Sequence, residues 1–222
     1  RAAGPSLRAQ SKPPRREAVF PPLFAPKALP DRFPVSGRMM PDLMFYNGWG
    51  GFSPDGNEYV IIKNKNHLPA PWINVLANPE FGCLISELGT GYTWWQNSRE
   101  MKLTPWSNDP VLDQPGEMCY LRDEASGEIW SPVPFISDSD NPYYVTHGWG
   151  YTHFSHERHG IDHMMTVMIP TEEPIKIINI RLRNNTSEQR NISVTYFAEW
   201  VLGVQRSKNA PYIMTEWDES AQ

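Results

Sequence analysis

The sequence of 222 residues is short of the features that define several large protein classes. It has only two cysteines, Cys83 and Cys119, too few for the disulfide framework of a small secreted domain. No run approaches the roughly 18 apolar residues that a membrane-spanning helix needs. Sustained heptads are missing, which excludes a coiled coil, and an aromatic content of 12% excludes wholesale disorder. Because the sequence begins at Arg1 rather than at methionine, we expect it to be a piece of a longer protein.

Proline, by contrast, is abundant, and at the N-terminus it is concentrated together with positive charge. The chain has 22 prolines, of which nine lie in residues 1–41. The same stretch has eight basic and two acidic residues, so it carries +6, whereas residues 42–222 carry −11. Proline removes backbone donors and fixes φ, so we predict an extended linker or arm at 1–41 and a folded domain at 42–222. A nucleic-acid-binding arm is the alternative, but the acidic domain behind it would repel DNA, and we expect no nucleic-acid partner.

From Tyr46 onward the apolar residues alternate with polar ones, as in half-buried β-strands. Segment 192–200 shows the clearest alternation and 178–183 a second one. Between them lies the polar run 184–189, which we predict to be a hairpin loop. Further strands are predicted at 58–62, 72–77, 81–87, 91–97, 117–122, 128–131, 143–147, 151–158, 161–169 and 212–217. Many short strands with Gly and Pro turns predict an all-β fold, an antiparallel β-sandwich.

One hairpin can be predicted in register. Two strand-like segments flank His159-Gly160, a two-residue turn in which glycine supplies positive φ. This register places His156 opposite His163 and points His153 to the other face of the sheet. The two facing imidazoles could hold zinc or copper, but a third ligand is needed. Since solvated cross-strand histidines are the commoner outcome, we predict exposed histidines and no metal site.

Segment 91–110 has the densest mixture of aromatic and polar side chains. Trp94 and Trp95 are adjacent in a predicted strand, so one faces in and the other faces out. An exposed indole offers a flat apolar surface to a sugar ring, and polar side chains beside the indole can form hydrogen bonds with the sugar hydroxyls. The ordinary alternative is a core tryptophan followed by turn residues. The candidate substrate-binding residues from this segment are Trp95, Asn97, Arg99, Glu100, Trp106, Asn108 and Asp109.

No catalytic residue can be assigned from the sequence. Carboxylates are frequent on or beside the predicted strands, but a glycosidase needs two of them roughly 5–10 Å apart, which the sequence does not reveal. A nucleophile elbow, a P-loop and a dinucleotide-binding glycine motif are all missing. Cys83 and Cys119 lie within predicted strands and are expected to be small buried hydrophobic residues.

Five longer motifs nevertheless occur in one order. They are FYNGWGGFSPDGNEYVI, PAPWINVLANPEFGCLISELGTGYTWWQNSREMKLTPWSNDP, GEMCYLRDEASGEIWSP, HGWGYTHFSHERHGI and SVTYFAEWVLG. Together they resemble the N-terminal β-sandwich of glycoside hydrolase family 94, over about residues 43–218. Within that family the likeness is greatest to the branch of the cyclic β-1,2-glucan synthases and 1,2-β-oligoglucan phosphorylases, with cellobiose phosphorylase further away.

The resemblance implies a β-supersandwich of the galactose-mutarotase type, and it leaves open that the sandwich is incomplete at the C-terminus. In the family, this domain precedes an (α/α)₆ barrel that carries the general-acid Asp and most phosphate ligands, so the resemblance implies no catalytic residue in this chain. A loop after the last strand reaches the active site of a neighbouring subunit in cellobiose phosphorylase-like members. The matching stretch adds Gln205, Arg206 and Lys208 to the candidate substrate-binding residues, and implies a homodimer.

Three functions follow from these observations. The first is a non-catalytic N-terminal domain of a phosphorylase or glycosyltransferase acting on β-glucans, with β-1,2 linkages favoured. Such a domain would shape the substrate cleft and a subunit contact, need no cofactor, and leave inorganic phosphate as a co-substrate of the whole enzyme. The second is a stand-alone carbohydrate-binding module, and the third is a mutarotase-like epimerase with His147 or His153 as its acid. The expected location is the cytoplasm, or its face of the inner membrane for a cyclic glucan synthase.

Overall fold

The structure is a computed structural model, and it describes residues 40–65, 68–106, 109, 114–136, 139, 141–216, 218 and 220. The predicted arm at 1–41 lies outside the described residues apart from Met40 and Pro41. The regular secondary structure of the described part consists almost entirely of β-strands, with one short α-helix and two 3₁₀ turns. The predicted all-β class is therefore confirmed.

Twelve strands follow one another in the part of the chain that the structure describes. They are β1 (Gly50–Phe52), β2 (Tyr59–Lys63), β3 (Ile73–Ala77), β4 (Phe81–Ser86), β5 (Gly91–Trp95), β6 (Glu117–Asp123), β7 (Ile129–Trp130), β8 (Tyr143–Gly148), β9 (Tyr151–Arg158), β10 (Ile161–Met168), β11 (Ile177–Asn184) and β12 (Ile192–Ala198). The 3₁₀ turn η1 (Pro134–Ile136) precedes β8, and α2 (Arg206–Asn209) and η2 (Ala210–Tyr212) follow β12.

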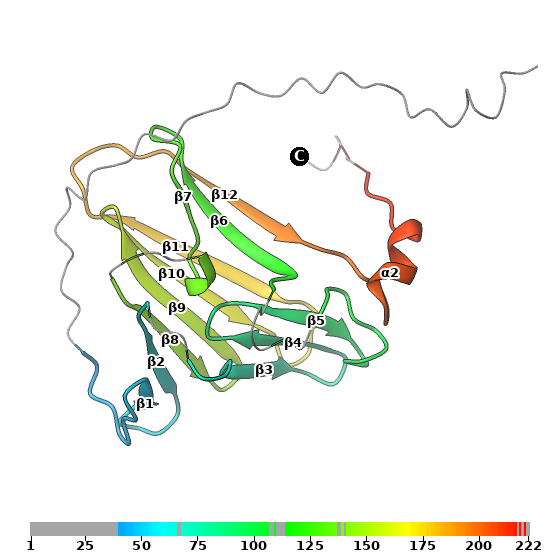
Figure 1. Ribbon diagram of the computed structural model, residues 1–222, viewed down its shortest axis with the longest axis horizontal. Coiled ribbons are helices and arrows are strands. Elements are labelled where there is room, and N and C mark those ends of the chain that lie inside the picture. Colours follow the sequence, from blue (N-terminus) through cyan, green and yellow to red (C-terminus); the bar gives the residue numbers. More distant parts are fainter. Residues whose placement is uncertain are drawn as a thin grey trace, which may run out of the picture.

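These strands form three antiparallel sheets. The largest has the order β1-β2-β8-β9-β10-β11, and the two smaller ones have the orders β12-β6-β7 and β3-β4-β5. Figure 1 shows the sheet of β6, β7 and β12 lying across the strands β8 to β11, with β3 to β5 beside them. The arrangement is a sandwich, as the alternating sequence pattern predicts.

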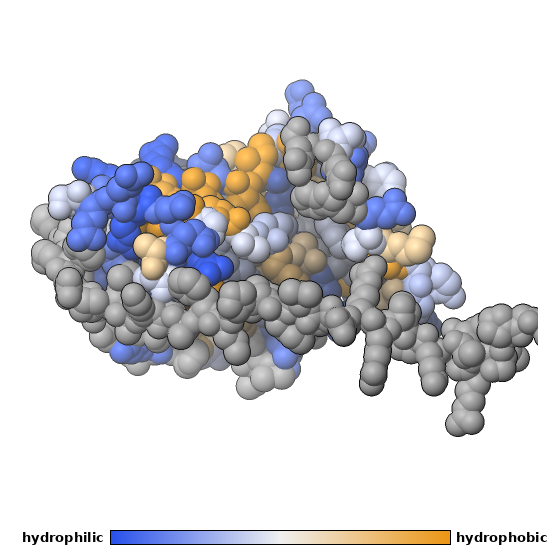
Figure 2. Space-filling model, turned by 90° about the horizontal axis from the view of Figure 1, so that it is seen from above, coloured by the Kyte–Doolittle hydropathy of each residue, from blue (hydrophilic) through white to orange (hydrophobic). Residues whose placement is uncertain are grey.

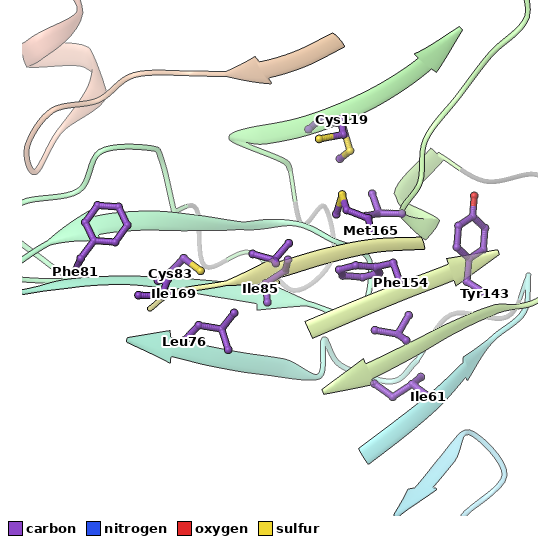
Figure 3. Close-up of a cluster of buried hydrophobic side chains, with 14 residues drawn as sticks. Ile61, Leu76, Phe81, Cys83, Ile85, Cys119, Tyr143, Phe154, Met165 and Ile169 are labelled. Atoms are coloured by element: carbon purple, nitrogen blue, oxygen red, sulfur yellow. The ribbon is translucent and has the colours of Figure 1, made fainter. Parts of the chain in front are cut away.

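The core lies between these layers because alternate residues of each strand point into it. On β9, Phe154 is fully buried while its neighbours His153 and Ser155 are only half-buried. Figure 3 shows Phe154 and Met165 on adjacent strands below Cys119 of β6. Burial of such side chains is the main stabilising contribution to a fold of this kind.

The predicted β9–β10 hairpin is confirmed in its register. Arg158 lies opposite Ile161, His156 opposite His163, and Phe154 opposite Met165. His159 and Gly160 both have positive φ, 52° and 73°, as the mirror-image turns of tight hairpins require.

The predicted exposure of the paired histidines is wrong. His156 and His163 are each only 1% exposed, and the ring of His156 stacks on Tyr143 with a centroid distance of 3.7 Å. Within the described residues, no three His, Cys, Asp or Glu side chains are grouped as a metal site. The pair faces the interior because its strand face also carries Phe154 and Met165, which the core requires.

Two predictions about the C-terminal strands are also wrong. β11 and β12 do not form a hairpin, since β11 pairs with β10 and β12 pairs with β6 in another sheet. Arg190 in the connection bonds Asp123 through Nε at 2.8 Å and the carbonyl of His159 through Nη1 at 2.8 Å, which ties the connection to both layers. Residues 212–216 are not a strand, because η2 and irregular chain follow the helix α2, and Trp217 lies outside the described residues.

The two cysteines provide a first test of the core. Both are buried, and burial raises the pKa of each thiol to about 11. Since the thiolate is the reactive form, we expect neither to react with Ellman's reagent at pH 8 within minutes, whereas both react at once in urea. Rapid modification of either thiol in the native protein would contradict this packing.

Candidate functional site

The loop after β5 and the segment after β12 lie together at one corner of the molecule. Lys102 forms β-bridges to Trp94 on one side and to Gly203 on the other. The amide of Gly203 donates to the carbonyl of Lys102 at 2.8 Å, and that of Val201 donates to Leu103 at 2.8 Å. Figure 1 shows α2 beside the end of β5 as a result. We call residues 94–102 and 199–209 the β5 corner.

The β5 corner brings together most of the candidate residues from the sequence. Trp95 is 40% exposed. The other candidate residues in the corner are also exposed, and they are Asn97, Arg99, Glu100, Gln205, Arg206 and Lys208. The two candidate groups are about 100 residues apart in sequence, so their proximity is a result of the tertiary structure. The corner therefore brings two exposed indoles, those of Trp95 and Trp200, and several hydrogen-bonding groups into one region of the molecule.

Part of this polar chemistry is already used within the corner. The side-chain oxygen of Asn97 accepts the amides of Arg99 and Glu100 at 2.9 and 2.8 Å, which closes the turn after β5. Arg99 pairs with Glu100 at 3.3 Å, and Arg206 pairs with Glu199. The side-chain oxygen of Asn97 is therefore used to form an Asx turn, which is a common role of asparagine in loops.

The backbone of the β5 corner is strained on both sides. Gln96 has φ 55° and Leu202 has φ 48°, values that residues with a Cβ rarely adopt. The side-chain amide of Asn209 stabilises the backbone conformation at Leu202, because it donates hydrogen bonds to the carbonyls of Val201 and Leu202 at 2.9 and 3.1 Å. Such residues are concentrated at functional sites, where the surrounding structure enforces them.

Trp106 lies with Trp94 rather than with the exposed Trp95. Its ring packs on Tyr92 at 4.9 Å, and Tyr92 contacts Trp94 at 5.1 Å, so these three rings share the face of β5 opposite to Trp95. Trp94 also covers Gly82, where a Cβ would come within 2.2 Å of the indole. Asp109 is half-buried, and Asn108 lies outside the described residues. The structure therefore divides the predicted segment between two faces.

A buried ionic network lies on the inner side of β5 and β6. The Glu117 carboxylate accepts hydroxyl hydrogens from Thr93 at 2.5 Å, Thr104 at 2.6 Å and Tyr196 at 2.8 Å, and it pairs with Lys176. Although burial alone raises the pKa of Glu117, the Lys176 ammonium and the hydrogen bonds from Thr104 and Thr93 outweigh it and lower that pKa. An ionised, fully bonded carboxylate is a poor proton donor, so the network is structural.

The sequence contains one local signal for this network. Glu117 shares its strand face with Cys119 and Leu121, which are buried. A carboxylate on a buried face requires a charged partner. Lys176 is the partner, and only the fold reveals it, because it lies 59 positions away in sequence.

Next to this network a groove of about 570 Å³ opens between the sheets. We call it the β11–β12 groove. Its walls are mostly apolar, and they include Phe81, Leu103, Ile178, Ile180, Val194 and Trp200. Figure 2 shows the molecule from the side of β6, β7 and β12, where hydrophobic side chains form a band bordered by hydrophilic ones.

A comparison with known families decides the assignment. Residues 57–222 match the supersandwich domain of glycosyl hydrolase family 94. The chain belongs to this family. The resemblance predicted from the five motifs is thereby confirmed, and so is the supersandwich architecture.

Several curated family 94 relatives are similar to the chain. It is 40% identical over 183 residues to the cyclic beta-(1,2)-glucan synthase NdvB of Rhizobium meliloti (strain 1021), over 82% of this chain and 6% of that protein. It is 31% identical over 171 residues to the N,N'-diacetylchitobiose phosphorylase of Vibrio proteolyticus, over 75% and 21% of the two chains. It is 27% identical over 158 residues to the solabiose phosphorylase of Paenibacillus borealis, over 70% and 20%.

The chain thus spans about a fifth or less of the length of these family 94 relatives. It is a domain of a family whose members act on sugars. Among the residues that the structure describes, no helix has the length and apolar character needed to cross a membrane.

Proposed function

We propose that this domain is the non-catalytic N-terminal part of a family 94 enzyme that acts on β-glucans, with β-1,2-linked chains as its first candidates. The identity of 40% to a cyclic beta-(1,2)-glucan synthase supports this choice over the phosphorylases, to which identity is 31% and below. The bond-breaking residues belong to an (α/α)₆ barrel elsewhere in the polypeptide. The location is the cytoplasm or its face of the inner membrane.

The observation that carries the proposal is the meeting of two candidate groups at the β5 corner. Trp95 presents part of its indole to solvent, and sugar rings stack on such surfaces through their C–H faces. Arg99 and Lys208 are exposed in the two segments that meet at this corner, and both can donate hydrogen bonds to hydroxyl groups. The corner thus forms one wall of the substrate cleft, and the strained backbone at Gln96 and Leu202 holds it in shape.

The same corner forms the subunit contact of a homodimer. Arg206 and Lys208 lie on α2, which projects from the β-sandwich. Guanidinium and ammonium groups suit phosphate, so in a phosphorolytic enzyme they approach inorganic phosphate at the neighbouring active site. Because Arg206 already pairs with Glu199, its movement toward phosphate would break an exposed ion pair of little energy.

A titration with oligosaccharides tests the sugar contact. We expect β-1,2-linked glucose oligomers at millimolar concentration to shift the indole N–H signal of Trp95 in an NMR spectrum of this chain. The signal of Trp149, which is 85% exposed elsewhere, should not move. Trp95→Ala should weaken binding at least about tenfold, as loss of a stacking platform does, while Trp149→Ala leaves it unchanged.

Two other results would contradict the proposal. Equal shifts of both indoles would mean that the sugar binds exposed aromatic residues without preference. Tight binding, in the micromolar range, by this chain alone would favour a stand-alone carbohydrate-binding module instead.

A further inference from the structure

The hairpin turn between β8 and β9 is tied to the small sheet of β3, β4 and β5 by the side chain of Asn74. The Asn74 amide on β3 donates to the carbonyls of Gly148 and Tyr151 at 3.0 Å each. The same nitrogen lies 3.1 Å from Oγ1 of Thr152. Since β8 and β9 belong to the large sheet, these contacts join two sheets at one turn.

His147 makes a second tie at the same place. Its Nε2 lies 3.3 Å from the carbonyl oxygen of Trp72, just before β3, and its Nδ1 lies 3.0 Å from Oγ1 of Thr152. A carbonyl oxygen only accepts hydrogen bonds, so Nε2 must carry the hydrogen. In the neutral ring Nδ1 then accepts, and the Thr152 hydroxyl donates to it. These contacts therefore select one neutral tautomer of His147.

A second proton on His147 does not fit this arrangement. Nδ1 would become a donor, and the hydrogen of the Thr152 hydroxyl would have to turn away from it. Thr152 is 0% exposed, and within the described structure its hydroxyl contacts only Asn74 and His147. The hydroxyl hydrogen would therefore be buried without an acceptor, which is unfavourable.

No carboxylate is placed to compensate a positive charge on the ring of His147. The titratable groups on the neighbouring elements are Glu58, Tyr59 and Lys63 on or beside β2, Tyr151 and His153 on β9, and Glu87 after β4. Glu58 accepts a hydrogen bond from Tyr151, and Glu87 accepts one from the amide of Trp72. Among the described residues, neither carboxylate pairs with His147. Burial lowers the pKa of His147, although its bond to the Trp72 carbonyl opposes this.

The histidines nearby in sequence differ from His147 in this respect. His153 bonds Thr166 through Nδ1 at 2.8 Å, and both residues lie in the large sheet. His159 lies 2.6 Å from a carboxylate oxygen of Glu128, which would compensate a positive charge. Of these three, His147 alone joins two sheets without a carboxylate partner.

We propose that His147 is a pH-sensitive clamp between the large sheet and the strand β3. The neutral ring holds the β8–β9 turn against β3, and protonation releases the turn together with Trp149, which is 85% exposed at its tip. The rest of the sandwich stays folded, because the buried pair Val145 and Phe154 lies further along the hairpin and keeps its contacts. The clamp does not depend on which sugar the enzyme uses.

The direction of the pH effect follows from the two states of the turn. In the released turn the imidazole is solvated and titrates near its ordinary value of 6.5, whereas in the closed clamp its pKa is lower. The closed state is therefore fully favoured above that ordinary value, and it is lost as the pH falls from there toward the closed-state pKa. The equilibrium constant for opening should rise by about three- to tenfold from about pH 7.5 to about pH 5.5.

Nitrogen NMR of the imidazole tests the clamp without a substitution. At neutral pH we expect the tautomer of His147 with its hydrogen on Nε2, and a titration midpoint clearly below 6.5. A neutral ring with its hydrogen on Nδ1, or a midpoint at or above 6.5, would overturn the proposal.

Hydrogen exchange tests the movement of the turn. After correction for the intrinsic pH dependence of exchange, the amides of residues 147–152 should open about three- to tenfold more at the lower pH than at the higher one. Amides in the centre of β10 should not change over the same range. A parallel rise throughout the sandwich would show global unfolding, and an unchanged turn would show that no clamp opens, so either result contradicts the proposal.

Two glutamine variants in the same hairpin separate the clamp from other titrating groups. His147→Gln cannot be protonated and keeps a donor for the Trp72 carbonyl, so the opening of the turn should lose its pH dependence. The matched control His153→Gln should retain it, since His153 bonds within the large sheet. The opposite pair of results would make His153 the sensor and refute the clamp. If His147→Gln does not fold, the NMR titration of the parent protein still decides.

Discussion

Lys176→Met should lower the free energy of unfolding by about 3–5 kcal/mol at pH 7, because it leaves the Glu117 carboxylate buried without its cation. Glu117 is 8% exposed, and its hydrogen bonds from Thr93 and Tyr196 cannot replace a full positive charge. Urea unfolding followed by tryptophan fluorescence measures the change. An effect below about 1 kcal/mol would show that the pair does not contribute to the core as described.

A matched ion pair on the surface gives the control for Lys176→Met. Arg206 pairs with Glu199, but its side chain is 63% exposed. Arg206→Met should therefore cost less than about 1 kcal/mol. The double variant Glu117→Gln, Lys176→Met should cost less than the sum of the two single changes, because it no longer buries an unpaired charge.

The loss in the free energy of unfolding that Lys176→Met causes should depend on pH, because the pKa of Glu117 differs between the parent and the variant. In the parent protein that pKa lies below its ordinary value of 4.5, so the stability it contributes is present above about that pH and is lost as the pH falls through the folded-state pKa. Without Lys176, burial raises the pKa instead, and the folded state then favours the protonated acid. The stability lost in Lys176→Met should therefore be largest at neutral pH. It should begin to shrink above pH 4.5, where the buried acid of the variant becomes protonated, and shrink further below 4.5, where the parent carboxylate is protonated in turn.

Gly91→Ala is expected to have the second large effect, at least about 3 kcal/mol. Gly91 begins β5 with φ +148°, and a Cβ there would lie 1.9 Å from the carbonyl oxygen of Leu84 on β4. Since a backbone atom cannot move aside as a flexible side chain does, the pairing of β4 with β5 must shift. Such a shift would also displace Thr93 and Trp95, which β5 positions.

Gly56→Ala separates steric overlap from the cost of positive φ alone. Gly56 has φ +74°, and a Cβ there would have no heavy atom within 4 Å. We expect Gly56→Ala to cost about 1–2 kcal/mol, the usual penalty for this conformation. If Gly91→Ala cost no more than this in urea unfolding, the close approach of β4 and β5 would be contradicted.

The strands were predictable where one face of each is buried and the other is not. The predictions for β2 to β6 and β8 to β10 agree with the structure to within one or two residues at each end. β1 was missed because Gly50 and Gly51 have no side chains to show an alternation. The prediction at 212–217 fails for its described residues because Pro211 and the preceding short helices stop strand pairing.

The candidate site was only partly predictable, for a related reason. Residue types in 97–100 and 205–208 suggested sugar contacts, but their meeting depends on Lys102 bridging Trp94 and Gly203. The assignment of one indole to each face of β5 was correct. The sequence did not show that Trp106 joins Trp94 on the face away from Trp95, since ring contacts across a loop have no local signal.

Local periodicity and turn residues in the sequence determined the all-β class, the register of the β9–β10 hairpin and the family. These features depend on residues within a few positions of one another, or on long ordered motifs. The partner of each sheet edge, the pairing of Glu117 with Lys176 and the open β11–β12 groove were decided by the tertiary structure alone. They depend on contacts between residues far apart in the chain, which form only when whole sheets pack to remove apolar surface from water.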